Sequence, residues 1–101
     1  MTEKDFYVYL LAKQKNGTIY KGMTSDLIKR ISQHRIGAGN GFTKRYNVKK
    51  LFWYRRCGSA EEAVMWEKRL RRYPRQWKIN LIKEKNPNWI DLWDEINGLH
   101  A

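Results

Sequence analysis

Residues 6–11 read FYVYLL, and residues 18–23 read TIYKGM. The first run is aromatic and apolar without a gap, which favours a strand that is covered on both faces. Asn16-Gly17 lies between the two runs and is the strongest short-range signal for a hairpin turn. The segment from residue 6 to residue 23 therefore predicts a β-hairpin.

The register of this hairpin decides which side chains lie together. If Asn16-Gly17 is a two-residue turn, Lys13 faces Tyr20 across the hairpin. Because side chains alternate along a strand, Tyr9 and Tyr20 then share one face of the sheet, provided that no bulge interrupts either strand. Tyrosines in strands most often serve packing, so a functional role needs further support.

Helix signals follow the hairpin. Thr24-Ser25-Asp26 offers N-caps for a helix in which Leu27 and Ile31 recur at helical spacing, through about Arg35. Ser59 begins a capping box, with glutamate three residues later, which predicts a helix from Ala60 to about Arg72.

The remaining segments complete an α+β architecture. The glycines Gly37, Gly39 and Gly41 predict a flexible loop, and residues 51–54 (LFWY) predict a third strand. Pro74 is expected to begin one helix through Trp77, Leu81 and Ile82, and Asn86-Pro87 a last short helix through Trp89, Leu92, Trp93 and Ile96. The expected order is β-β-α-β-α-α-α, with a small antiparallel three-stranded sheet flanked by helices, in a single domain over residues 1–101.

The charge of the chain points to a polyanionic partner. Lys and Arg total 21 against 10 Asp and Glu, which gives a net charge of +11. No acidic residue occurs from Leu27 to Ala60, and a second basic run follows Glu67. Such one-sided charge favours a nucleic acid, or less often an anionic membrane, over a merely solubilising surface.

Other classes of protein are disfavoured. The sequence has no apolar run long enough to span a membrane, and its opening, MTEKD, is unlike a signal peptide. Cys57 is the only cysteine, which excludes an internal disulfide and favours a reducing compartment such as the cytoplasm. With only His34 and His100 to join it, a structural zinc site is disfavoured.

Two further features carry potential chemistry. Arg30 and His34 are four residues apart, so they project from one face of the predicted helix. Glu67 lies close to the apolar stripe of the later helix, with basic residues directly after it. It could form an internal salt bridge, for which the candidate partners are Lys68, Arg71 and Arg30. It could instead hold Mg²⁺ against a phosphate, because Mg²⁺ needs few protein carboxylates.

In their order along the chain, these residues resemble a known family. Residues 7–9 (YVY), followed after ten residues by 20–22 (YKG), resemble the two-part signature of the GIY-YIG nuclease superfamily. Further matching segments are 23–27 (MTSDL), 41–46 (GFTKRY), 66–68 (WEK), 77–82 (WKINLI) and 86–89 (NPNW). Together they look like the small stand-alone bacterial branch, which is related to the N-terminal nuclease module of the UvrC excision-repair subunit.

The resemblance implies a role for each matching residue. One of Tyr9 and Tyr20 would activate or position the attacking water. Arg30 would stabilise charge on the scissile phosphate, and His34 would take part in proton transfer. Glu67 would bind the metal, Mg²⁺ or Mn²⁺, which can act as a Lewis acid and template.

Other positions match the structural part of the motif or depart from it. Tyr7 and Val8 replace the glycine and isoleucine of the first motif, and Gly22 is the small residue that allows a close approach. Lys21 replaces a usually apolar residue and must extend toward solvent if it points inward. A late asparagine of larger members could correspond to either Asn80 or Asn86.

The leading hypothesis is a Mg²⁺-dependent endonuclease that cuts DNA in repair or processing. Sequence specificity is expected to be low, because no appended targeting domain is seen. The basic residues outside the catalytic set are candidates for phosphate contacts that carry no sequence information: Lys29, Lys44, Arg45, Lys49, Lys50 and Lys78. The main alternative is a nucleic-acid-binding module without catalysis. A third is a protein adaptor using Trp89 or Trp93, although both are expected in the core.

Overall fold

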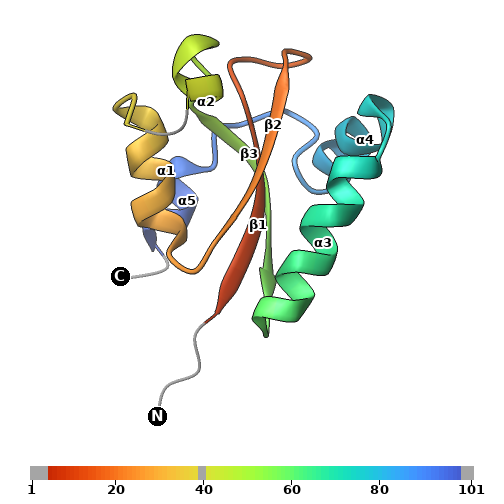
Figure 1. Cartoon of the computed structure of the whole chain (residues 1–101). Helices are drawn as coiled ribbons and strands as arrows, with labels where there is room; N and C mark the ends of the chain where they lie inside the picture. Colours follow the sequence, from red (N-terminus) through yellow and green to blue (C-terminus); the bar gives the residue numbers. More distant parts are fainter. Residues whose placement is uncertain (1–4, 39–40, 99–101) are drawn as a thin grey trace.

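The computed structural model describes residues 5–38 and 41–98, built around a three-stranded antiparallel sheet (Figure 1). Strand β1 (Phe6–Ala12) pairs with β2 (Ile19–Thr24) on one side and with β3 (Lys50–Cys57) on the other. The order β2-β1-β3 leaves β2 and β3 at the two edges of the sheet. The α+β class and the small antiparallel sheet that the sequence predicts are confirmed.

Helices cover both faces of this sheet. In the described part of the chain they are α1 (Leu27–Arg35), α2 (Gly41–Arg45), α3 (Ala60–Arg72), α4 (Arg75–Lys85) and α5 (Trp93–Asn97). Helices α1 and α5 lie on one side, and α3 and α4 lie on the other (Figure 1). None of these helices is long and apolar enough to cross a bilayer.

The central strand is buried because both helix layers pack on it. Val8 and Leu10 belong to the apolar cluster that includes α3 and α4, whereas Tyr9 and Leu11 belong to the cluster on the side of α1 and α5. This two-sided burial explains why the sequence of β1 is apolar without the alternation of a half-exposed strand.

The hairpin has a longer connection than the predicted two-residue turn. Tyr9 pairs with Gly22 and Leu11 pairs with Tyr20, so the expected pairing of Lys13 with Tyr20 is wrong. The amide of Gly17 donates to the carbonyl of Gln14, closing a turn in which Asn16 has φ 62°. The register differs by two residues, which preserves the side-chain alternation. The prediction that Tyr9 and Tyr20 share one face is therefore correct.

The predicted caps position the helices on either side of β2. The Asp26 carboxylate accepts from the amide of Lys29 at the start of α1. The Ser59 hydroxyl accepts from the amide of Glu62 at the start of α3. Each cap satisfies an amide that has no partner within its helix.

Two segments differ from the sequence-based expectation. The predicted flexible loop contains helix α2, which ends before Asn47, a residue with φ 56° that is typical just beyond a helix. The last helix begins at Trp93 rather than at Asn86, because the Asn86 side chain bonds the backbone of Phe52 and Ile90 instead. Gly39, His100 and the chain start on which the signal-peptide expectation rested (residues 1–4) lie outside the described residues.

Candidate active site

Strand β2 is the edge strand between the α1 layer and helix α3 (Figure 1). Because side chains alternate along it, Tyr20 and Gly22 face the α1 layer, while Lys21 faces α3. A site built on β2 can therefore draw residues from both helix layers.

On the α1 side, three polar side chains form a buried chain of contacts. The hydroxyl oxygen of Tyr9 lies 3.1 Å from Nε2 of His34, and Nδ1 of His34 lies 3.0 Å from Oγ1 of Thr43. The exposed fraction of both Tyr9 and His34 is 1%. This chain connects β1, α1 and α2, and it fixes the orientation of the imidazole.

The protonation of this chain follows from burial and charge. Burial, together with the positive charge of Arg30, lowers the pKa of His34 from 6.5 to about 4. Burial raises the pKa of Tyr9, although Arg30 opposes that rise. At pH 7 the imidazole is therefore neutral, with one ring nitrogen donating and the other accepting, and the Tyr9 phenol keeps its proton.

Arg30 and Tyr20 complete this side of the site. The Tyr20 ring lies 5.7 Å from the His34 ring, measured between centroids. Arg30 is partly exposed, and its Nη1 donates to Oε1 of Gln33 at 3.2 Å. The structure thus brings four of the predicted residues together around β2: Tyr9, Tyr20, Arg30 and His34.

The glycine of the second motif makes room for the tyrosine of the first. A Cβ at Gly22 would overlap the phenol of Tyr9, which crosses the strand at this point. The close approach expected at Gly22 is therefore made by a side chain of the neighbouring strand.

On the α3 side, Glu67 is held by two cations. Nζ of Lys21 lies 2.8 Å from Oε1 of Glu67, and Nη2 of Arg71 lies 2.9 Å from Oε2. Burial acts to raise the pKa of Glu67, but the hydrogen bonds and charges of Lys21 and Arg71 outweigh it and lower that pKa. Of the partners considered from the sequence, Arg71 is confirmed. Lys21, which approaches from β2, was not among them.

Comparison with known proteins bears on this arrangement. The chain matches the family described as the GIY-YIG catalytic domain from residue 5 to residue 80, which is more than half of its length. The matched range contains the five predicted catalytic residues, Tyr9, Tyr20, Arg30, His34 and Glu67. The chain belongs to the GIY-YIG family.

Small bacterial proteins are similar to this GIY-YIG chain over most of their length. A UPF0213 protein of Staphylococcus saprophyticus is 33% identical over 78 residues, covering 77% of this chain and 94% of that protein. A UPF0213 protein of Clostridium perfringens is 33% identical over 91 residues, with coverages of 90% and 97%. The solution NMR structure of a UPF0213 protein from Bacillus halodurans has 32% identity and a TM-score of 0.53, covering 84% of this chain and 89% of that one. The predicted resemblance to the small GIY-YIG branch is confirmed.

The donor chemistry at Glu67 fits a divalent metal of the Mg²⁺ type. The described residues contain no group of three or more His, Cys, Asp or Glu side chains that could enclose an ion. Mg²⁺ is commonly held by one or two carboxylates, with waters and substrate phosphate as the other ligands. Glu67 can supply one such carboxylate, but a metal must compete with Lys21 and Arg71 for its oxygens.

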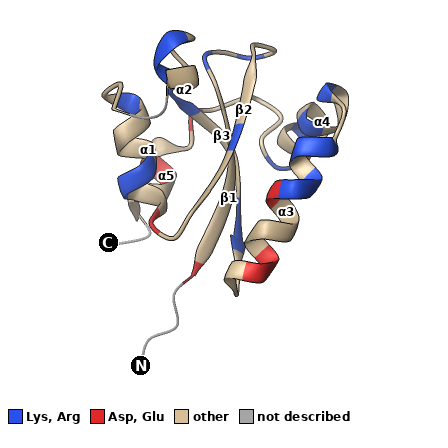
Figure 2. Cartoon of the chain, in the orientation of Figure 1, with Lys and Arg blue, Asp and Glu red and all other residues tan. Residues whose placement is uncertain are grey.

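Basic residues lie on both sides of β2. Figure 2 shows Lys and Arg on α2, on the C-terminal part of α3 and on α4, while Glu61 and Glu62 lie at the start of α3. The predicted phosphate-contact residues are exposed at Lys29, Lys44, Arg45 and Lys50 and half-buried at Lys49 and Lys78. Burial, followed by the charges of Lys21 and Arg75, lowers the pKa of Lys78.

Sequence reasoning assigned no role to several residues that lie at the candidate site. Thr43, Phe42 and Tyr46 come from α2 and the residue after it, in the segment predicted as a loop. The resemblance of residues 41–46 to the family indicates that this segment matters, but it does not indicate which residues these side chains contact. Lys21 departs from the family motif, and its pairing with Glu67 of α3 depends on tertiary contact that the sequence does not reveal.

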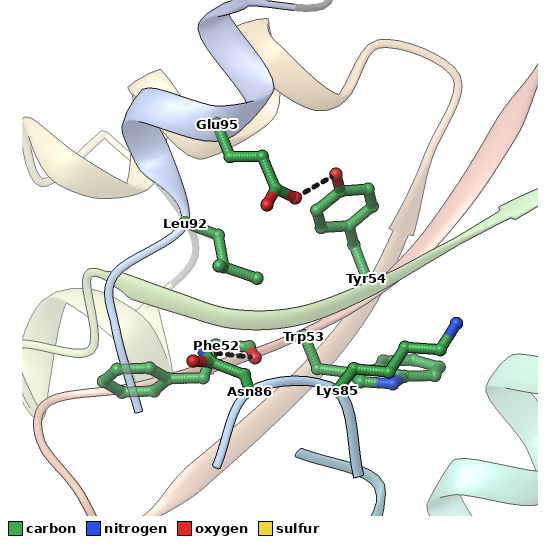
Figure 3. A pocket seen from close by; sticks show the side chains of 7 residues that line it. All are labelled: Phe52, Trp53, Tyr54, Lys85, Asn86, Leu92 and Glu95. Carbon is green, nitrogen blue, oxygen red and sulfur yellow. Dashed lines mark hydrogen bonds between the residues drawn. The ribbon is translucent and has the colours of Figure 1, made fainter. Parts of the chain in front are cut away.

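A pocket of about 300 Å³ lies at the opposite edge of the sheet, beside β3 (Figure 3). There the Tyr54 hydroxyl donates to Glu95, and Asn86 donates to the carbonyl of Phe52. These contacts attach α5 and the preceding segment to β3. Asn86 therefore has a structural role, and Asn80 is exposed on α4 with a hydrogen bond from Gln76.

The tryptophans of the last segment are packed, as expected. Trp89 is 7% exposed and contacts Phe52, and Trp93 is half-buried under the guanidinium of Arg35. Helix α4 runs through Trp77, Leu81 and Ile82 as the sequence predicts, and Trp77 is 55% exposed on it.

Proposed function

We propose that this protein is a Mg²⁺- or Mn²⁺-dependent endonuclease that hydrolyses phosphodiester bonds in DNA. The observation that carries the proposal is the gathering of Tyr9, Tyr20, Arg30 and His34 on one side of β2, with Glu67 on the other side of the same strand. Membership of the GIY-YIG family supports nuclease chemistry. In this proposal the described residues act as part of one nuclease domain spanning residues 1–101.

Each residue has a role that its environment suits. Arg30 is partly exposed and carries a permanent charge, so it can neutralise charge that develops on the scissile phosphate. Tyr9 is buried and keeps its proton, so it serves to orient His34 rather than to meet the substrate. Tyr20 is half-buried, and we assign to it the tyrosine role of positioning the attacking water.

His34 is suited to exchange protons within this site. Its imidazole is neutral at pH 7 and lies beside the rings of both tyrosines. Glu67 would hold the divalent metal, which supplies Lewis-acid charge neutralisation at the phosphate when it is bound. The protein's part is to orient the carboxylate, which α3 carries toward β2.

Low sequence specificity fits the same arrangement. The basic residues that flank β2 can contact the phosphate backbone, which fixes position without reading bases. We further propose a role in DNA repair or processing in the cytoplasm, in keeping with the likeness to the UvrC nuclease module and with the single cysteine.

Cleavage assays with matched variants test this function. Purified protein with Mg²⁺ or Mn²⁺ is expected to cut DNA in a panel of plasmid, single-stranded, branched and RNA substrates. Glu67→Gln should abolish cleavage, and Arg30→Ala should lower kcat by about 100-fold or more, since it removes a charge that stabilises the transition state.

Glu61→Gln is the matched control, because Glu61 is an exposed carboxylate on the same helix. It should leave cleavage unchanged. Equal cleavage by Glu67→Gln and the unmodified protein would identify a contaminating nuclease and overturn the assignment.

A non-catalytic nucleic-acid-binding module is the second candidate. The observation that favours it is the pairing of Glu67 with Lys21 and Arg71, which is also how a purely structural carboxylate would be satisfied. This alternative predicts salt-sensitive binding without cleavage, and no effect of Glu67→Gln on that binding.

A further inference from the structure

Three aromatic rings extend outward from the candidate active site. The centroids of Tyr20 and Phe42 are 5.7 Å apart with a stacked geometry of 28°, and those of Phe42 and Tyr46 are 4.8 Å apart at 46°. Tyr20 is half-buried, whereas Phe42 is 41% exposed and Tyr46 is 48% exposed. The row thus continues from the site to the surface.

The outer end of this row borders an open space. A hollow of about 310 Å³ lies beside Tyr46, between the hairpin connection and the start of β3, and Lys13 and Val48 are among its lining residues. A planar group placed on Tyr46 could therefore extend into this hollow.

The charges around the row specify the kind of ligand. Lys44 and Arg45 flank it on α2, and the Arg45 guanidinium lies 5.6 Å from the centroid of Tyr46. No acidic residue occurs in the sequence between Asp26 and Glu61. Exposed aromatic faces among cations suit a ligand with flat rings and phosphates, which is a single-stranded nucleic acid. A duplex hides its base faces within the stack, so only an unpaired base can use them.

We propose that Phe42 and Tyr46 form a stacking platform for an unpaired nucleobase next to the phosphate that is cut. The substrate class is then nucleic acid with single-stranded character, such as a flap, a gap or a branched junction. This inference rests on the proposed nuclease function, and it names the substrate of that same site.

Binding measurements on the full chain test the platform without requiring catalysis. Fluorescence anisotropy in EDTA compares a labelled oligothymidine strand with an abasic strand of equal length, which keeps the phosphates and lacks the bases. The unmodified protein should bind the oligothymidine about tenfold more tightly, because stacking on aromatic rings favours the strand that has bases. Equal affinity for the two strands would overturn the proposal without any variant.

Variants locate the effect. Phe42→Leu and Tyr46→Leu should each weaken oligothymidine binding by about tenfold and leave abasic binding unchanged, whereas Phe42→Trp should retain the affinity. Trp77→Leu is the matched control, since Trp77 is an exposed aromatic residue on α4, and it should have no effect. Unchanged oligothymidine binding, or an equal loss on both strands, would contradict a stacking role.

The outcome separates the platform from the nuclease assignment. Metal-dependent cleavage by the unmodified protein together with equal binding of the two strands would reject the platform and leave the nuclease function standing. A clear preference for the strand with bases, without cleavage of any substrate, would retain the platform and reject the nuclease function.

Discussion

The imidazole of His34 lies in a fully enclosed position, between the hydroxyls of Tyr9 and Thr43 and near the rings and charge of Tyr20 and Arg30. Its pKa falls from 6.5 in the unfolded chain to about 4 in the folded protein. Between these two pH values, the unfolded chain binds a proton at His34 and the folded protein does not. This contribution to stability is complete above about pH 6.5 and is lost as the pH falls toward about 4.

We expect thermal unfolding to report this loss. The Tm of the unmodified protein should decrease between pH 7 and pH 5, a range in which ordinary carboxylates titrate little. His34→Gln should have a lower Tm at pH 7 but a flatter dependence on pH. Parallel pH profiles for the two proteins would show that His34 does not control the acid sensitivity.

We expect Lys21 to lower the affinity of the proposed metal site. Its ammonium occupies an oxygen of Glu67 and adds a like charge beside any incoming cation. Lys21→Met should therefore bind Mn²⁺ about tenfold more tightly, which corresponds to roughly 1.4 kcal/mol. Calorimetric titration measures this directly, without substrate.

Lys68→Met provides the control for the metal measurement. It removes an equal charge from an exposed position on α3, next to Glu67 in the sequence, and should change the affinity for Mn²⁺ little. If Lys21→Met binds Mn²⁺ no more tightly than Lys68→Met does, the competition between Lys21 and the metal is absent.

At the level of elements, the sequence predicts a helix correctly where an N-cap residue is followed by apolar residues at helical spacing. Helix α3 begins after Ser59 and ends at Arg72 as predicted, and α1 follows the cap at Asp26. The hairpin strands were found as well. Their common face was predicted correctly because an error of two residues in register does not change side-chain direction.

The elements that were missed depend on contacts with distant residues. Helix α2 contains glycine and no apolar period, and its buried Thr43 contacts His34 of α1. The segment after Asn86 is not helical, because the Asn86 side chain donates to the backbone carbonyl of Phe52 in β3. Local periodicity identifies neither His34 as the partner of Thr43 nor Phe52 as the partner of Asn86. The candidate site was predicted mainly through its motif, whereas its partners Lys21 and Thr43 required the fold.

For the whole molecule, the excess of positive charge makes binding to nucleic acid sensitive to salt. Each phosphate contact contributes about 0.9 to the slope of log K against log salt concentration on duplex DNA. If Lys44 touches a phosphate as we propose, Lys44→Ala should reduce the magnitude of this slope by about 0.9, which is the contribution of one contact. Binding titrations over a range of salt concentrations measure the slope.

Arg56→Ala is the control for the salt titration. It removes the same charge from an exposed residue of β3 that pairs with Asp5. Its slope should match that of the unmodified protein. An equal reduction in the two variants would mean that net charge alone governs binding.

The position of the site on an edge strand has a consequence for local stability. Every residue of β2 is only partly buried, whereas β1 has five consecutive fully buried residues, from Val8 to Ala12. Opening β2 therefore exposes less apolar surface than opening the centre of the sheet, and it needs less free energy than global unfolding. We therefore expect the strand that carries Tyr20, Lys21 and Gly22 to open locally at a lower free energy than β1.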